Sequence, residues 1–270
     1  MMRALWTAGS GMKAQQFNVD VISNNLANVN TTGYKKERAE FKDLLYQTMQ
    51  RAYVLDQSGK PVNLQVGHGT AVCATVRDYE SGTPEKTDST LDFAIEGEGF
   101  FTIMGPSGEV QYTRDGSFMT SQTADGMRKL TTSDGYAVLD NNGEEIVFDS
   151  DVDISKLVVT PQGQMSYTNS AGETVPLDAT MGMVTFSNKY ALEATGRNLF
   201  SKNSASGEPV QVSDQAVGKS LISQGYLESS NVQVVDEMVK LIVAQRAYEI
   251  NSKAIQSSDD MLQIANNLRR

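Results

Sequence analysis

Apolar residues recur every seven positions near both ends of the chain. At the N-terminus, one such set consists of Leu5, Met12, Val19 and Leu26. A second set lies three residues further on and contains Ala8, Ile22 and Val29, with polar Gln15 as its exception. Spacings of three and four residues place side chains on one face of a helix. The pattern predicts an N-terminal helix that ends near Gly33, because glycine readily takes the left-handed conformation found after helices.

The C-terminal segment carries a longer version of this pattern. Its apolar set, again at intervals of seven, is Val234, Leu241, Tyr248, Ile255 and Leu262. We expect a helix over about 232–268, capped by Ser229, Ser230 or Asn231. At 1.5 Å per residue it would be roughly 55 Å long, so much of its apolar stripe must meet another helix. Periodicity leaves two arrangements open, a two-helix hairpin within the chain and a coiled assembly of several chains.

The middle of the chain has the pattern of an all-β domain. All six prolines lie between Pro61 and Pro209, and short β-branched and aromatic runs alternate with turn residues. One hairpin is predicted over 100–113, and the Asn142-Gly143 pair predicts another. Further strands are expected at 157–159, 165–167, 174–175 and 183–186, and residues 201–220 resemble a linker in composition.

These patterns predict an α+β fold class, with long N- and C-terminal coiled-coil-type helices flanking a central all-β domain. The N-terminal helical region covers residues 1–46, and a second helical stretch is expected over 41–51. Residues 47–70 follow no pattern that assigns them to either neighbouring region. The central β domain then covers 71–220, and the C-terminal helix region covers 221–270.

Composition narrows the functional classes. The chain has 23 basic and 33 acidic residues among 270, a formal charge of −10, which argues against a nucleic-acid partner because cations to neutralise phosphates are scarce. The sequence contains no run of about 18 apolar residues, so no transmembrane segment is predicted. Residues 1–20 lack the features of a cleaved secretory signal. One histidine, His68, and one cysteine, Cys73, leave little material for acid–base or metal chemistry. An enzyme is therefore disfavoured.

Candidate chemical motifs have simpler structural interpretations. Gly97 and Gly99 lack the third glycine of a phosphate-binding loop, so a bulge or tight strand entry is expected there. The alternating Asp149, Asp151 and Asp153 lack the glycine and terminal glutamate of a calcium loop. His68 is expected in a loop, and Cys73 is expected as a small buried thiol. We predict no catalytic residue, no metal site and no cofactor.

An asparagine cluster at the end of the N-terminal helix has two possible explanations. Asn24, Asn25, Asn28 and Asn30 weaken an isolated helix, because asparagine is a poor helix former. They can mark a solvated, frayed end. Alternatively, their amides can form hydrogen bonds to neighbouring chains once the helix is packed.

Five sequence blocks together resemble a known family. They cover residues 25–36 (NLANVNTTGYKK), 96–101 (EGEGFF), 112–118 (YTRDGSF), 225–232 (GYLESSNV) and 245–251 (QRAYEIN). In this order they are similar to the flagellar rod, hook and hook-associated axial proteins. The resemblance assigns family-motif positions to Asn25, Asn28, Thr31, Gly33, Gly97, Gly99 and Asn231.

Within that family, the length and residues 43–48 and 248–254 most resemble distal-rod members. A hook protein is usually longer, and a proximal-rod protein of similar length is the nearest rival. Distal-rod members carry a distinguishing extension after the N-terminal helix, which would be residues 47–70 here.

The resemblance implies a non-enzymatic subunit of a helical tube in the basal body. Its terminal helices would line an export channel, and the tube would transmit motor torque across the periplasm. Its partners would be further copies of itself, other rod and hook proteins, bushing ring proteins and the type III export apparatus, which would export it without signal cleavage. The heptad positions would form the assembly interface: Leu5, Met12, Val19, Ile22, Leu26, Val234, Leu241, Tyr248, Ile255 and Leu262. A secreted β-rich binding protein, such as an adhesin, is the competing hypothesis from another class.

Overall fold

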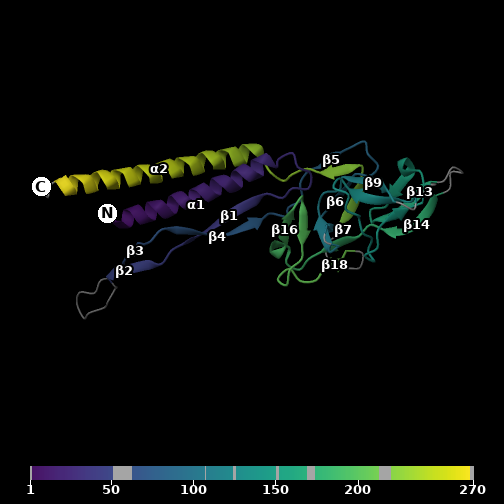
Figure 1. Cartoon of the computed structure of the whole chain (residues 1–270), viewed down its shortest axis with the longest axis horizontal. Helices are drawn as coiled ribbons and strands as arrows, with labels where there is room; N and C mark the ends of the chain where they lie inside the picture. The colour runs from purple at the N-terminus through teal and green to yellow at the C-terminus, as the bar shows by residue number, and fades with distance from the viewer. Residues whose placement is uncertain are drawn as a thin grey trace. The chain divides into compact units, whose positions relative to one another are not determined.

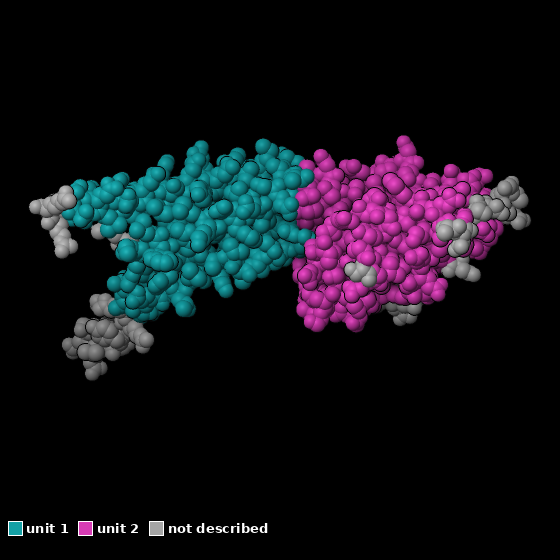
Figure 2. All heavy atoms as spheres, in the orientation of Figure 1, with its two compact units in different colours: residues 1–27, 37–78, 233–270 teal, residues 28–36, 79–232 magenta. Residues whose placement is uncertain are grey.

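The chain forms two compact units, each built from segments far apart in the sequence (Figure 2). The structure, a computed structural model, describes residues 2–50, 63–106, 108–123, 126–149, 152–168, 174–212 and 220–267. Unit 1 combines residues 1–27, 37–78 and 233–270, and unit 2 combines residues 28–36 and 79–232. The chain therefore crosses from one unit to the other after residues 27, 36, 78 and 232.

Unit 1 contains the two predicted helices, α1 (Met2–Ala27) and α2 (Val234–Asn267). They lie side by side and antiparallel, so that the two ends of the chain lie at the same end of the helix pair (Figure 1). Of the two arrangements that periodicity left open, the structure shows the hairpin within one chain. The predicted division at residues 46, 70 and 220 stays a prediction about domains.

The structure corrects the predicted end of the N-terminal helix and the predicted start of the C-terminal helix. α1 ends at Ala27, six residues before Gly33, and turns occupy the intervening segment. α2 begins at Val234, and the carbonyl of Gln233 accepts the first helical hydrogen bond from the Glu237 amide. The predicted cap residues bond elsewhere, because the Asn231 side chain accepts from the Lys36 amide and the Ser230 hydroxyl accepts from the Val232 amide.

A two-stranded antiparallel ribbon completes unit 1. Strand β1 (Glu37–Asp43) pairs with β4 (Thr70–Arg77), and β2 (Tyr46–Gln50) pairs with β3 (Leu64–Gly67). The predicted helix over 41–51 is therefore wrong. Its short apolar spacing suits a helix, but pairing with a strand some 30 residues further along the chain supplies hydrogen bonds that a local pattern cannot reveal. Residues 51–62 of the predicted extension lie outside the described residues.

Unit 2 is built from antiparallel strands. A six-stranded sheet has the order β16-β17-β8-β7-β15-β18, two three-stranded sheets have the orders β11-β10-β9 and β12-β13-β14, and β19 pairs with β6 and β20 with β5. The strands are β5 (Pro84–Lys86), β6 (Phe93–Glu96), β7 (Phe100–Met104), β8 (Val110–Thr113), β9 (Phe118–Gln122), β10 (Arg128–Thr132), β11 (Val147–Phe148), β12 (Leu157–Val159), β13 (Gln164–Thr168), β14 (Thr174–Thr180), β15 (Met183–Thr185), β16 (Glu193–Gly196), β17 (Leu199–Ser201), β18 (Val210–Gln211), β19 (Leu221–Gln224) and β20 (Tyr226–Glu228).

Most of the predicted hairpins are confirmed. β7 pairs with β8, β12 pairs with β13, and β15 lies within the predicted range. At the Asn142-Gly143 turn, Gly143 has φ +83° and its amide donates to the Asp140 carbonyl, 3.1 Å away. The predicted linker over 201–220 is more structured than expected, because β18 lies within it and Ser206 is fully buried.

The central sheet separates two apolar cores. Alternate side chains of β7 point to opposite faces, so Phe101 and Ile103 enter the larger core while Phe100 enters the smaller one. The smaller core is aromatic and consists of Tyr79, Phe100, Tyr112, Val184, Phe186, Leu192 and Phe200. Unit 2 therefore contains most of the buried apolar side chains among the described residues.

Candidate assembly site

The contact between α1 and α2 depends on small side chains. Ala14 on α1 and Ala244 on α2 are buried, and a Cβ atom added at Gly11 would lie 2.9 Å from the side-chain nitrogen of Asn251. Small residues let two helix backbones approach closely, whereas larger ones would hold them apart. The heptad pattern identified the helices, but these smaller residues set their spacing.

A family-motif asparagine connects three elements of unit 1. The Asn25 amide nitrogen donates to the Glu37 carbonyl at 2.7 Å and to Glu237 Oε2 at 3.2 Å. Its oxygen accepts from the Glu37 amide at 2.9 Å. Glu237 is itself buried and also accepts a hydrogen bond from Lys240 Nζ at 2.6 Å. Asn25 therefore joins α1 to β1 and α2 within its own chain, so neither the frayed end nor the neighbouring chain is needed to explain it.

The predicted heptad residues differ in how deeply their side chains are buried. Ile22 is buried, and Leu5, Met12, Val19, Leu26, Leu241, Ile255 and Leu262 are half-buried. Val234 and Tyr248 are 40% and 42% exposed. Part of this stripe is therefore used within the chain, and its role between subunits stays a prediction.

The most exposed apolar surface of α2 lies on a face that heptad reasoning did not single out. Its members are Val235, Met238, Val239, Ile242 and Val243, which are 50–73% exposed. We call these five residues the outer row. The same helix exposes Ile250, Met261 and Ile264, and α1 exposes Met2, Trp6 and Phe17. Apolar side chains exposed on consecutive turns of a helix, as in the outer row, are typical of an interaction face. The signal was present in the sequence, because the apolar residues of 234–244 extend beyond the heptad stripe, with Asp236, Glu237 and Lys240 on the remaining side.

Other motif residues shape the turns of unit 2. Gly33 has φ +67°, and an added Cβ would lie 2.7 Å from the backbone of Arg114 and Asp115. The Thr31 hydroxyl donates to Asn28 Oδ1 at 3.2 Å. Gly97 and Gly99 have φ +111° and +151° and form the tight entry into β7 that the sequence predicted. These residues fix backbone geometry, which explains their residue types.

Three charged side chains in the motif blocks form a buried cluster that sequence analysis did not predict. Glu228 Oε1 lies 2.5 Å from Lys35 Nζ, and Glu228 Oε2 lies 3.1 Å from Arg114 Nη1. All three side chains are at most 3% exposed. We call Lys35, Arg114 and Glu228 the ion cluster. A charged residue within each motif block was the available signal, but residues so far apart in sequence cannot be paired without the fold.

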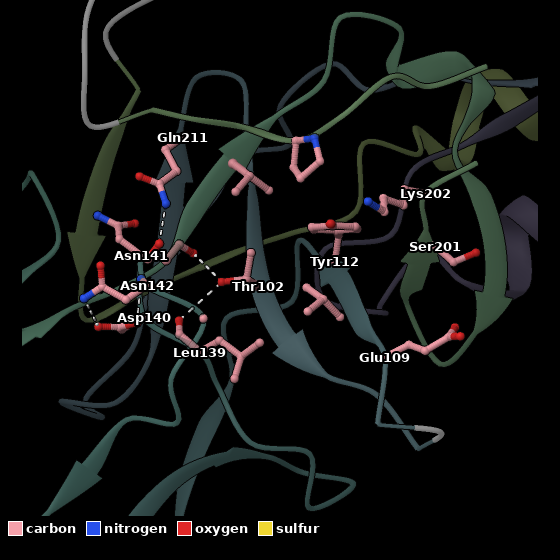
Figure 3. A pocket seen from close by; sticks show the side chains of 15 residues that line it. Thr102, Glu109, Tyr112, Leu139, Asp140, Asn141, Asn142, Ser201, Lys202 and Gln211 are labelled. Carbon is pink, nitrogen blue, oxygen red and sulfur yellow. Dashed lines mark hydrogen bonds between the residues drawn. The ribbon is translucent and has the colours of Figure 1, made fainter. Parts of the chain in front are cut away.

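Unit 2 also contains a cavity of about 650 Å³ on one face of the central sheet (Figure 3). Thr102, Tyr112 and Leu139 line it, and the Thr102 hydroxyl lies 3.3 Å from the Leu139 carbonyl. Burial raises the pKa of the Tyr112 phenol, and the hydrogen bond to Glu208 raises the pKa of Lys202 at the rim. Both shifts favour the form that is already present at neutral pH.

The remaining candidate residues are not among those that line this cavity. His68 Nδ1 lies 3.0 Å from the Leu45 carbonyl in unit 1. Cys73 is exposed on β4, so the predicted burial of its thiol is wrong, because this stretch of the ribbon leaves the side chain open to solvent. Asp149 and Asp153 are described but Asp151 is not. Within the described ranges, no group of three or more His, Cys, Asp or Glu side chains could hold a metal ion.

An antiparallel pair of terminal helices with an uncovered apolar face, attached to a β-rich unit, defines a structural assembly protein. Comparisons with known families agree. Residues 5–35 match the family described as flagella basal body rod protein, residues 94–167 the flagellar hook protein FlgE/F/G D1 domain, and residues 223–268 the flagellar basal body rod FlgEFG protein C-terminal.

Curated relatives match the chain over its whole length. The flagellar basal-body rod protein FlgG of Borreliella burgdorferi is 48% identical over 273 residues, covering 100% of both chains. The FlgG proteins of Caulobacter vibrioides and Bacillus subtilis are 44% and 36% identical, covering 99–100% of this chain and 100% of their own length. The chain therefore belongs to the flagellar basal-body rod protein family. No described helix is long and apolar enough to cross a membrane.

Proposed function

We propose that the protein is a subunit of the distal rod, and that it polymerises into a helical tube that transmits motor torque and encloses the export channel. The outer row of α2 carries this proposal. Five apolar side chains at 50–73% exposure cost free energy in water, and further copies of the chain can cover them. Contacts that do not close into a ring then produce a filament.

The charge pattern of α2 supports packing at this face. The outer row contains only apolar side chains, whereas Arg246, Glu249 and Lys253 lie further along the helix and are exposed. An apolar patch bordered by charges favours a defined contact position over indiscriminate aggregation. The coiled-coil packing of these helices between subunits belongs to this proposal, as do the ten heptad positions of the predicted interface.

The proposed partners follow from the family. They are further copies of the chain, other rod and hook proteins, the bushing ring proteins and the type III export apparatus, and the proposed location is the periplasm-spanning rod, reached without cleavage of a signal peptide. The proposed role is non-enzymatic. Residues 47–70 would be the extension that distinguishes distal from proximal rod subunits.

Electron microscopy of concentrated protein tests this proposal. Tubes of uniform diameter are expected from the unmodified chain, and Ile242→Glu should abolish them because it places an unpaired charge in the contact. The matched control is Val158→Glu, which changes a side chain with 52% exposure on β12 of unit 2, and it should leave tubes intact. Particles that stay small in the unmodified protein would favour the secreted binding protein instead.

Immunogold labelling of purified basal bodies separates the distal rod from its rivals. Label next to the hook supports the distal assignment. Label near the inner membrane would indicate a proximal-rod subunit, and label along the hook would indicate a hook-type protein.

A further inference from the structure

The chain crosses between the units four times, and three segments of unit 2 adjoin these crossings. All three segments form hydrogen bonds with one small group of residues. The segments are 28–36, which lies between two crossings, 79–82, which follows the third, and 228–232, which precedes the fourth. All the contacts described below lie within unit 2.

Glu228 connects these segments directly. Its carboxylate accepts from Lys35 Nζ at 2.5 Å and from the Gly82 amide at 2.7 Å. Its backbone carbonyl accepts from the Gly33 amide at 2.8 Å. Lys35 Nζ also donates to the Glu80 carbonyl at 2.7 Å. One residue on β20 therefore bonds to both other segments.

Two further residues close the network. Asn231 Oδ1 accepts from the Lys36 amide at 2.8 Å, and Asn231 Nδ2 donates to the Glu80 carbonyl at 3.2 Å. Arg114 Nη1 donates to Glu228 Oε2 at 3.1 Å, and Arg114 Nη2 donates to the Gly97 carbonyl at 2.6 Å. Arg114 thus ties the crossing segments to the loop at the start of β7, which belongs to the core sheet.

A buried ion pair is weak evidence for net stability, because removing charges from water offsets much of their attraction. A buried ion pair has a clearer effect on structural specificity, because each charged group requires its partners at fixed positions. Glu228 contacts two cations, so removing its charge weakens both contacts at once. Removing Lys35 instead leaves a balanced Glu228–Arg114 pair.

We propose that the ion cluster is a mechanical clamp that fixes the crossing segments to the core of unit 2. This inference rests on the proposed function for its biological meaning, because a subunit that transmits torque must pass force through these segments. Force on one crossing is then shared by the hydrogen bonds of all three segments. Lys35, Arg114 and Glu228 are positioning residues in this role.

Hydrogen–deuterium exchange of the full chain tests the clamp. In Glu228→Gln the new amide nitrogen faces donors and cannot accept from them, so exchange should rise at least tenfold in residues 28–36, 79–82 and 228–232 together. Residues 100–104 of β7 should keep their protection. Lys35→Met should have a smaller effect, with the Gly82 amide still protected by its bond to Glu228.

The matched control is Glu208→Gln, which removes the exposed Lys202–Glu208 pair of unit 2 by the same chemical change, and exchange in the three segments should not change. Unchanged protection in Glu228→Gln, or an equal loss at residues 100–104, would overturn the clamp. Tubes assembled from Glu228→Gln should also bend more, with a persistence length at least twofold shorter. If the unmodified chain forms no tubes, the proposed function fails, whereas the exchange result still decides the clamp.

Discussion

Individual residue types in this chain are explained mainly by backbone geometry and buried polar contacts. Asn25 satisfies its donor and acceptor groups against β1 and α2, and Glu228 bonds to segments nearly 200 residues away. The sequence blocks contained these residues, but their roles depend on partners from other blocks. Gly33 was expected to end a helix. It was correctly placed in the left-handed region, but its turn serves the packing of unit 2 instead.

Two glycines with similar backbone angles should respond differently to alanine. Gly143 has φ +83° and open space where a Cβ atom would be added, so Gly143→Ala should cost about 1 kcal/mol from conformation alone. Gly33→Ala adds a clash with the backbone of Arg114, so it should cost about 2–4 kcal/mol. Denaturant unfolding of both variants measures the difference, and equal losses would show that the turn at Gly33 relaxes freely.

At the scale of elements, sequence periodicity predicted the helices and hairpins, whose formation depends on residues close together in the chain. The helices and most hairpins were found because their apolar spacing or turn residues lie within a few positions of each other. Residues 41–51 were assigned wrongly because the strands that pair with β1 and β2 lie further along the chain, at Thr70–Arg77 and Leu64–Gly67. The outer row was missed for a different reason. Heptad counting selects one stripe, whereas residues 235–243 also carry apolar side chains beside that stripe.

The tight approach of α1 and α2 should make their contact intolerant of larger side chains. Ala244 is 1% exposed, so Ala244→Leu should destabilise unit 1 by about 1–3 kcal/mol through overpacking. Ala254 is exposed on the same helix, and Ala254→Leu should change stability by no more than about 0.5 kcal/mol. Thermal melts followed by circular dichroism at 222 nm report the helix pair. Similar midpoints for the two variants would contradict the described packing.

At the scale of the whole molecule, the two units differ in the apolar burial that stabilises them. Unit 2 contains two apolar cores, whereas the buried apolar side chains of the helix pair include only Ala8, Ala14, Val21, Ile22 and Ala244 among the described residues. Because the helix pair buries less apolar area, its folding gains less free energy to offset the loss of conformational entropy. The isolated chain therefore combines a robust β unit with a marginal helical unit that assembly would reinforce.

This imbalance predicts unfolding in two steps. The helical signal at 222 nm should be lost at a lower temperature than the near-ultraviolet signal of the aromatic core in unit 2. Ala244→Leu should lower only the first midpoint. Coincident transitions by both probes, and by calorimetry, would show instead that the units unfold as one cooperative body.

The antiparallel pairing of α1 with α2 also has a kinetic consequence. Asn25 and Glu237 are 212 positions apart, so their contact closes one of the longest loops this chain can form. Contacts of high sequence separation form slowly, because the entropy of loop closure is lost before they stabilise anything. When a chain emerges N-terminus first, α1 must wait for α2 before its buried face is covered. A chain truncated before Val234 thus lacks both the partner of α1 and the outer row, so incomplete copies would be excluded from assembly by their own folding.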